Sequence, residues 1–204
     1  MKLFIFDMGG VVANNVTIIP LMAESFGIGE ADFFLGAGSD PAATHTSPYH
    51  LGDIAALMRG ELSSAEFWEN FSRRTGIAVR GDPWYDCFRP ELNSDTAALV
   101  AGLRKKGRRV VCGTNTLEAH FRRHEERGDY RLFDRVYASH IMGIIKPDPA
   151  FWRFILKEEG APPEETFFAD DLAENVEAAR KLGIGAHLFT GAGELAETLK
   201  SLEG

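Results

Sequence analysis

Five polar residues of complementary chemistry follow apolar runs along this chain. They are Asp7, Thr114, Lys146, Asp170 and Asp171. A carboxylate can attack phosphorus to form an aspartyl-phosphate, which divides one difficult displacement into two easier ones. A lysine and a hydroxyl can hold the other phosphate oxygens as charge develops, and Mg²⁺ relieves the repulsion between neighbouring carboxylates. The set therefore predicts phosphoryl transfer.

Each of these residues also has a purely structural interpretation. Asp7 or Thr114 could cap the helix that follows it, and Lys146 could be a surface lysine in a proline-rich turn. The pair Asp170 and Asp171 could be a helix cap with a favourable dipole interaction. Their order favours one site, because ligands of open parallel sheets bind at the carboxyl ends of the strands.

The elements that must position these residues can be read from apolar runs and their breaks. The run at 3–6 is rich in Phe and Ile and too short for a helix, so it predicts a central parallel strand that ends at Asp7. Gly9 and Gly10 let the chain turn sharply beside that carboxylate.

From Asp95 onward, strand and helix patterns alternate, which is typical of an α/β fold with helices on both faces of a parallel sheet. We expect strands at 109–113, 135–139, 166–169 and 186–189, and helices at 95–106, 117–127, 149–159, 173–182 and 194–202.

Residues 13–93 contain no further strand-like run, whereas helical patterns recur at 51–58 and 63–74. The sequence therefore predicts a catalytic core made of residues 1–12 and 94–204, with an all-helical cap of residues 13–93 inserted after the first strand. The aromatic residues Phe67, Trp68 and Phe71 fit the core of this insert better than a ligand site.

Composition excludes several classes of function. The formal charge of −8 and the pI near 5.3 argue against nucleic acid or an anionic membrane as the main partner. Cys87 and Cys112 have neither a disulfide pattern nor metal-ligand spacing. The N-terminus lacks a signal-peptide pattern, and no apolar stretch reaches membrane-spanning length. We expect a cytoplasmic protein that acts on a small phosphorylated metabolite.

In its ordered motifs the chain resembles the haloacid dehalogenase superfamily of aspartyl-nucleophile phosphatases. Asp7 matches the nucleophile of motif I, Thr114 the hydroxyl residue of motif II, and Lys146 the lysine of motif III. Asp170 and Asp171 match motif IV. The resemblance covers nearly the whole length and implies a Rossmann-like core with a helical cap inserted after motif I.

The resemblance also implies ligands for Mg²⁺ and phosphate. The metal would be bound by Asp7, by the backbone carbonyl of Gly9 and by the motif IV acid, for which Asp170 is preferred. Asp171 would instead orient Lys146 or a metal-bound water. Thr114, Asn115, Lys146 and Gly10 would bind the phosphate.

One position departs from the pattern of the family. Most phosphatases of this superfamily carry an acid two residues after the nucleophile as a proton donor, and here that residue is Gly9. Loss of a positioned acid typically costs about 10² to 10⁴ in rate. A subgroup that includes bacterial alpha-glucose-1-phosphate phosphatases is similar here, so we expect a sugar 1-phosphate or another ester whose alcohol leaves easily.

Two other functions remain as alternatives. The protein could be a phospho-ligand sensor or regulatory protein that has lost catalysis, with Gly9 as the mark of that loss. It could instead be a 2-haloacid dehalogenase, although such enzymes use no metal and lack the acidic pair Asp170 and Asp171.

Some polar residues stay unassigned from sequence alone. His120 and His124 are four residues apart on one predicted helix, but they lack the further ligands of a zinc site. His120 could contact substrate or simply pack at the helix start. Substrate contacts in the insert are expected among Asn14, Asn15, His45, Tyr49, His50 and Asp53.

Overall fold

The computed structural model describes residues 1–14, 18–40, 42 and 50–202. In this part of the chain, five parallel strands form one sheet in the order β3-β2-β1-β4-β5. The α/β fold with a parallel sheet is thus confirmed, and the first strand lies at its centre. The strands are β1 (Leu3–Phe6), β2 (Arg109–Thr114), β3 (Arg135–Ala138), β4 (Thr166–Asp170) and β5 (Gly185–Leu188).

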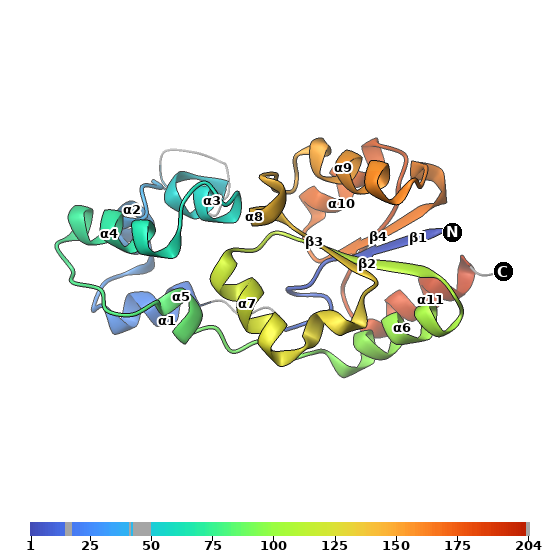
Figure 1. Cartoon of the computed structure of the whole chain (residues 1–204), viewed down its shortest axis with the longest axis horizontal. Coiled ribbons are helices and arrows are strands. Elements are labelled where there is room, and N and C mark those ends of the chain that lie inside the picture. The colour runs from blue at the N-terminus through green and yellow to red at the C-terminus, as the bar shows by residue number, and fades with distance from the viewer. Residues whose placement is uncertain (15–17, 41, 43–49, 203–204) are drawn as a thin grey trace.

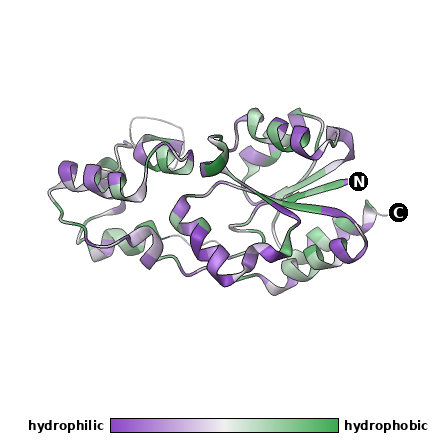
Figure 2. Cartoon of the chain, in the orientation of Figure 1, coloured by the Kyte–Doolittle hydropathy of each residue, from purple (hydrophilic) through white to green (hydrophobic). Residues whose placement is uncertain are grey.

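Helices cover both faces of the sheet (Figure 1). Because side chains alternate along a strand, Phe4 and Phe6 pack in one apolar cluster, and Leu3 and Ile5 pack in the other. Helices α6 (Ser94–Lys105) and α11 (Ala192–Ser201) complete the first cluster, and α9 (Pro149–Glu159) and α10 (Ala173–Lys181) complete the second. Figure 2 shows hydrophobic residues along much of the central strands.

Helix α7 (Glu118–Arg127) follows β2, and the short α8 (Ser139–Met142) follows β3. Two 3₁₀ turns, η2 (Asp129–Leu132) and η3 (Pro163–Glu165), precede β3 and β4. The strand and helix positions expected after residue 94 are confirmed to within a few residues at their ends.

A second lobe of helices lies between β1 and α6 in the chain, beside the carboxyl ends of the strands (Figure 1). Its helices pack around their own apolar cluster, which includes Phe33, Phe67 and Phe71. The lobe coincides with the predicted insert, whose role as a cap domain stays a prediction. It comprises α1 (Ile19–Ser25), α2 (Glu30–Gly36), α3 (Gly52–Met58), α4 (Ser64–Thr75) and α5 (Pro83–Asp86).

The helices predicted at 51–58 and 63–74 are confirmed as α3 and α4. Ser63 and Glu66 form a capping box at the start of α4, which satisfies the first backbone N–H groups of that helix. Helices α1, α2, α5 and α8 were not predicted. Each has at most seven residues, a length at which periodicity is weak, and α3 is the one described helix of that length whose pattern was recognised. Among the described residues, no helix combines the length and apolarity needed to cross a membrane.

Candidate active site

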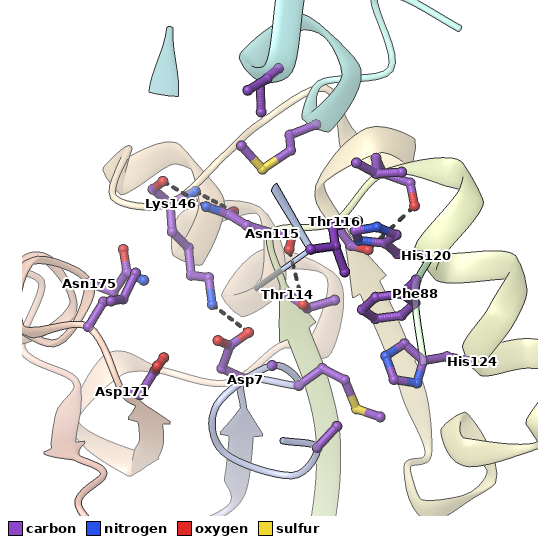
Figure 3. Close-up of a pocket in the computed structure, with 18 of the residues that line it drawn as sticks. Asp7, Phe88, Thr114, Asn115, Thr116, His120, His124, Lys146, Asp171 and Asn175 are labelled. Carbon is purple, nitrogen blue, oxygen red and sulfur yellow. Dashed lines mark hydrogen bonds and ion pairs between the residues drawn. The ribbon is translucent and has the colours of Figure 1, made fainter. Parts of the chain in front are cut away.

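The carboxyl ends of the three middle strands bring three predicted residues together. Asp7 follows β1, Thr114 ends β2 and Asp170 ends β4. Since β1 lies between β2 and β4 and all three run in the same direction, these residues meet at one edge of the sheet. Figure 3 shows the side chains of Asp7, Thr114 and Lys146 gathered around one pocket.

Lys146 is a buried cation that joins Asp7 to the acidic pair. Its Nζ atom lies 2.9 Å from Oδ1 of Asp7, and it donates hydrogen bonds to Oδ2 of Asp170 (2.7 Å) and to the carbonyl oxygen of Gly113 (3.0 Å). Burial alone would lower the pKa of Lys146, but the charges of Asp170 and Asp7 raise it above its ordinary value. A fixed positive charge therefore stands beside the predicted nucleophile.

Asn115 positions the backbone of Lys146. Its Nδ2 donates to the carbonyl oxygen of Lys146 (2.9 Å), and its Oδ1 accepts from the backbone N–H of Lys146 (2.8 Å). Both polar atoms of the amide therefore bond to the chain, and the predicted contact of Asn115 with phosphate stays a prediction. The pair of bonds attaches the Lys146 loop to the end of β2.

The two neighbouring acids have different surroundings. Asp170 is fully buried, and its Oδ1 accepts from the N–H of Leu172 and from Nδ2 of Asn175, both at 2.9 Å. Because Oδ2 of Asp170 also accepts from Lys146, it is Asp170 and not Asp171 that contacts this lysine; the other role expected of Asp171, orienting a metal-bound water, stays a prediction. Side chains alternate between the two faces along a strand, so Asp170 lies on the same face of the sheet as Phe168. The Lys146 amine is on this face too, since its Nζ atom lies 5.5 Å from the centre of the Phe168 ring.

Asp171 is only partly buried and lines the pocket, and it lies close to Gly10. Burial and then the charge of Asp170 raise the pKa of Asp171 above its ordinary value. Gly10 has a φ of +77°, which favours glycine, and it gives the acid room. Gly10 thus supports Asp171, and its predicted contact with phosphate stays a prediction.

Asp7, Asp170 and Asp171 form an acidic group that could hold a metal ion. One carboxylate oxygen from each lies within 4.8 Å of the others. Burial raises the pKa of Asp7 to about 7, with Lys146 opposing this rise and Asp170 adding to it. The protein alone therefore compensates the negative charge incompletely, and a hard cation with oxygen ligands would compensate it. The donor set fits a divalent cation of this kind.

A cavity of about 640 Å³ opens at this edge of the sheet and reaches the helical lobe. It brings together most of the predicted site residues, while Gly10 and Asp170, which is bonded to Lys146, are not among its lining residues. The predicted residues in its lining are Asp7, Gly9, Thr114, Asn115, Lys146 and Asp171.

His120 and His124 both lie in the cavity wall (Figure 3). The ring of His120 stacks on Phe88 with centres 3.9 Å apart, and Nδ1 of His124 lies 2.8 Å from Oδ2 of Asp129. In the described ranges, neither histidine belongs to a group of three potential metal ligands. Both histidines therefore make contacts typical of residues in a cavity wall and not those of metal ligands.

The polar residues expected in the insert have different locations. Asn14 and His50 line the cavity. Asp53 does not, because its carboxylate pairs with Arg74 at 2.7 Å. Asn15, His45 and Tyr49 lie outside the described residues.

Sequence reasoning missed the apolar part of the wall. These residues come from the helical lobe and from the start of α7, and in sequence they are indistinguishable from core positions. Only the folded arrangement shows that one side of the lobe's core faces the cavity. They include Ile18, Ile19, Ile54, Met58, Trp84, Phe88 and Leu117.

Two known relatives match this chain over most of its length and over most of their own. The chain is 29% identical to the sesquiterpene phosphatase astK of Aspergillus oryzae over 195 residues, 92% of this chain and 89% of that protein. It is 26% identical to the D-ribitol-5-phosphate phosphatase of Bacteroides thetaiotaomicron, over 90% of this chain and 89% of that protein. A match to drimenol cyclase drtB of Aspergillus calidoustus is 40% identical but spans 37% of this chain and 14% of that protein.

A similar fold is found in a solved HAD family enzyme from Bacteroides thetaiotaomicron, in complex with magnesium and inorganic phosphate. The TM-score is 0.69 at 23% identity, covering 92% of this chain and 93% of the other. The family model for haloacid dehalogenase-like hydrolases matches residues 1–183. This match covers most of the chain and includes every residue of the site described above. The chain belongs to the haloacid dehalogenase-like hydrolases.

Proposed function

We propose that this protein is a Mg²⁺-dependent phosphatase that hydrolyses a small phosphate monoester through an aspartyl-phosphate at Asp7. The observation that carries the proposal is the position of Asp7, which lines the cavity, lies 2.9 Å from the Lys146 amine and groups with two further acids. A nucleophile, a fixed cation and a potential metal site thus share one cavity edge.

In the first step, a carboxylate oxygen of Asp7 forms a bond to phosphorus, and the bond from phosphorus to the ester oxygen breaks. The alcohol leaves with that bonding pair and takes a proton from solvent. In the second step, water attacks the phosphorus of the aspartyl-phosphate and gives a proton to solvent, and the bond from phosphorus to the Asp7 oxygen breaks, which releases inorganic phosphate and restores Asp7. Lys146 and Thr114 would stabilise the non-reacting oxygens during both displacements.

Mg²⁺ would be held by Asp7, Asp170 and Asp171, with the carbonyl of Gly9 as a further ligand. When bound, it would neutralise charge on the phosphate and on the acids. The acidic group within 4.8 Å supports this assignment, as does the similar fold solved with magnesium and inorganic phosphate.

Two relatives that match most of the chain are phosphatases, which supports the reaction type. Their named substrates have very different organic parts, so the two relatives do not indicate which alcohol this protein's substrate carries. The absence of an acid at Gly9 favours an ester whose alcohol leaves easily, and a sugar 1-phosphate remains a candidate on that ground.

The test is phosphate release from a panel of sugar phosphates, nucleotides, alkyl phosphates and an aryl phosphate, with Mg²⁺ and with EDTA. Asp7→Asn is expected to abolish release, whereas Asp32→Asn, at an exposed position on α2, is the matched control. Release that needs Mg²⁺ and Asp7 supports the proposal.

Two other outcomes would overturn it. An absence of release from every ester, while phosphate and Mg²⁺ still bind, would indicate a phospho-ligand sensor. Halide release from 2-haloacids that survives EDTA would indicate a dehalogenase.

A further inference from the structure

The cavity has two chemically different sides. One side carries Asp7, Lys146 and Asp171, where the phosphate would bind. The other side carries Phe88 and His120, with Thr114 and Thr116 between the two (Figure 3). A volume of about 640 Å³ lies within the range of roughly 300–1,000 Å³ typical of pockets for drug-sized ligands. The space therefore exceeds what phosphate alone would need.

The side away from the phosphate site is built from large apolar side chains. Ile18 and Ile19 come from the start of α1, Ile54 and Met58 from α3, and Leu117 precedes α7. Each is buried to at least nine-tenths and belongs to the apolar cluster of the helical lobe. The wall is thus the inner surface of a packed core.

Charged groups are scarce on this side. Among the described lining residues, the carboxylate besides those of Asp7 and Asp171 is that of Glu174, whose Oε1 lies 3.9 Å from Nδ1 of His50. Burial lowers the pKa of His120 to about 3, and burial also lowers the pKa of His124. Both imidazoles therefore present neutral rings at pH 7.

A sugar would fit this wall poorly. It carries a hydroxyl group on nearly every carbon, and each hydroxyl buried without a partner costs about 1–3 kcal/mol. On the phosphate side (Figure 3), Oδ1 of Asp7 and Oδ1 of Asn175 are buried without a hydrogen-bond partner; on the remaining lining residues such atoms are Nε1 of Trp84, Nε2 of His120 and Oη of Tyr130. These atoms suit an isolated polar group, not a ring of hydroxyls. Hydrocarbon gains roughly 25 cal/mol for each Å² removed from water.

We propose that the alcohol part of the substrate is apolar, an aliphatic or aromatic alcohol, and that the Ile18, Ile54, Met58, Trp84 and Phe88 wall binds it. This inference rests on the proposed phosphatase function and names its substrate class. Phenols leave more easily than aliphatic alcohols, which suits a site without an acid at Gly9.

The direct test is a series of straight-chain alkyl phosphates from ethyl to octyl, with 2-phenylethyl phosphate, glucose 1-phosphate and ribose 5-phosphate. If the wall binds the alcohol, kcat/KM rises with each methylene, by up to about fourfold for full burial. The longer alkyl esters and the 2-phenylethyl ester should exceed both sugar phosphates. A flat series, or sugar phosphates as the preferred substrates, would overturn the inference.

A matched pair of variants locates the effect. Ile54 and Leu57 are both buried on α3 in the same cluster, but only Ile54 is among the residues of the cavity wall. Ile54→Ala should lower the ratio of kcat/KM for octyl over ethyl phosphate, whereas Leu57→Ala should lower that ratio less. Equal effects of the two changes would show that the alkyl group of the substrate does not bind at this wall, which would contradict the inference.

A binding measurement distinguishes a failure of this inference from a failure of the proposed phosphatase function. Octylphosphonate and ethylphosphonate, which cannot be hydrolysed, can be compared by calorimetry on the Mg²⁺-loaded wild type. Tighter binding of the octyl compound without turnover of any ester would support the apolar site and contradict the phosphatase function. Turnover of esters, together with equal affinity for the two phosphonates, would support the phosphatase function and contradict the apolar site.

Discussion

Asp171 lies so close to Gly10 that a Cβ atom on Gly10 would come within 2.3 Å of its Oδ2. Gly10 also has a φ of +77°, which costs other residues about 1–2 kcal/mol. The neighbouring Gly9 differs on both counts, since its φ is not positive and a Cβ there would meet nothing within 4 Å. The two glycines therefore have separable roles beside the proposed metal site.

Alanine at each position tests this difference. We expect Gly10→Ala to displace the Asp171 carboxylate and to weaken Mg²⁺ binding or activity by about 10–100-fold, as is typical when a group supporting a metal ligand is lost. Gly9→Ala should have the smaller effect. The measurement is the Mg²⁺ concentration needed for half-maximal phosphate release. Equal losses in both variants would contradict the role assigned to Gly10.

Asn115 is expected to act through Lys146 and not by touching phosphate. Asn115→Ala removes both bonds to the Lys146 backbone, so kcat should fall by up to about 10² through misplacement of the amine. KM should change less. Steady-state kinetics separates the two parameters. A rise in KM at constant kcat would instead support the phosphate contact that the sequence suggested.

The sheet and the positions of the site residues were predictable because both follow from local patterns. Short apolar runs end at polar residues, and parallel topology requires these ends to meet at one edge. This reasoning located Asp7, Thr114 and Asp170 before any coordinates were known. It also located Lys146, through its place after the third strand.

The division of roles between Asp170 and Asp171 could not be predicted in this way. It depends on which of two adjacent side chains faces Lys146. Side chains alternate between the two faces of a strand, so this is decided by the position of each acid at the end of β4. The apolar wall was missed for another reason. Trp84 and Phe88 have the same pattern in sequence whether they fill a core or line a cavity, because large apolar side chains occupy both kinds of position.

An acid restored at residue 9 should increase turnover of esters with poor leaving groups. Space exists, since a Cβ on Gly9 meets nothing within 4 Å. Gly9→Asp should raise kcat for alkyl phosphates by a factor within about 10² to 10⁴, and it should change kcat for an aryl phosphate much less. Gly9→Asn is the matched control, because it has similar size and no transferable proton. A gain shared by both variants, or absent from Gly9→Asp, would contradict this account of Gly9.

His120 should make the fold sensitive to acid. Burial lowers its pKa from 6.5 to about 3, so between these values the unfolded chain binds a proton that the folded chain excludes. Stability therefore falls as pH decreases through this window, with up to about 1.4 kcal/mol lost per pH unit from this group. His120→Phe removes the contribution and keeps a ring to stack on Phe88. Urea unfolding at pH 6 and pH 4.5 should show a smaller loss in the variant than in the wild type, and parallel losses would mean that His120 is protonated in the folded protein.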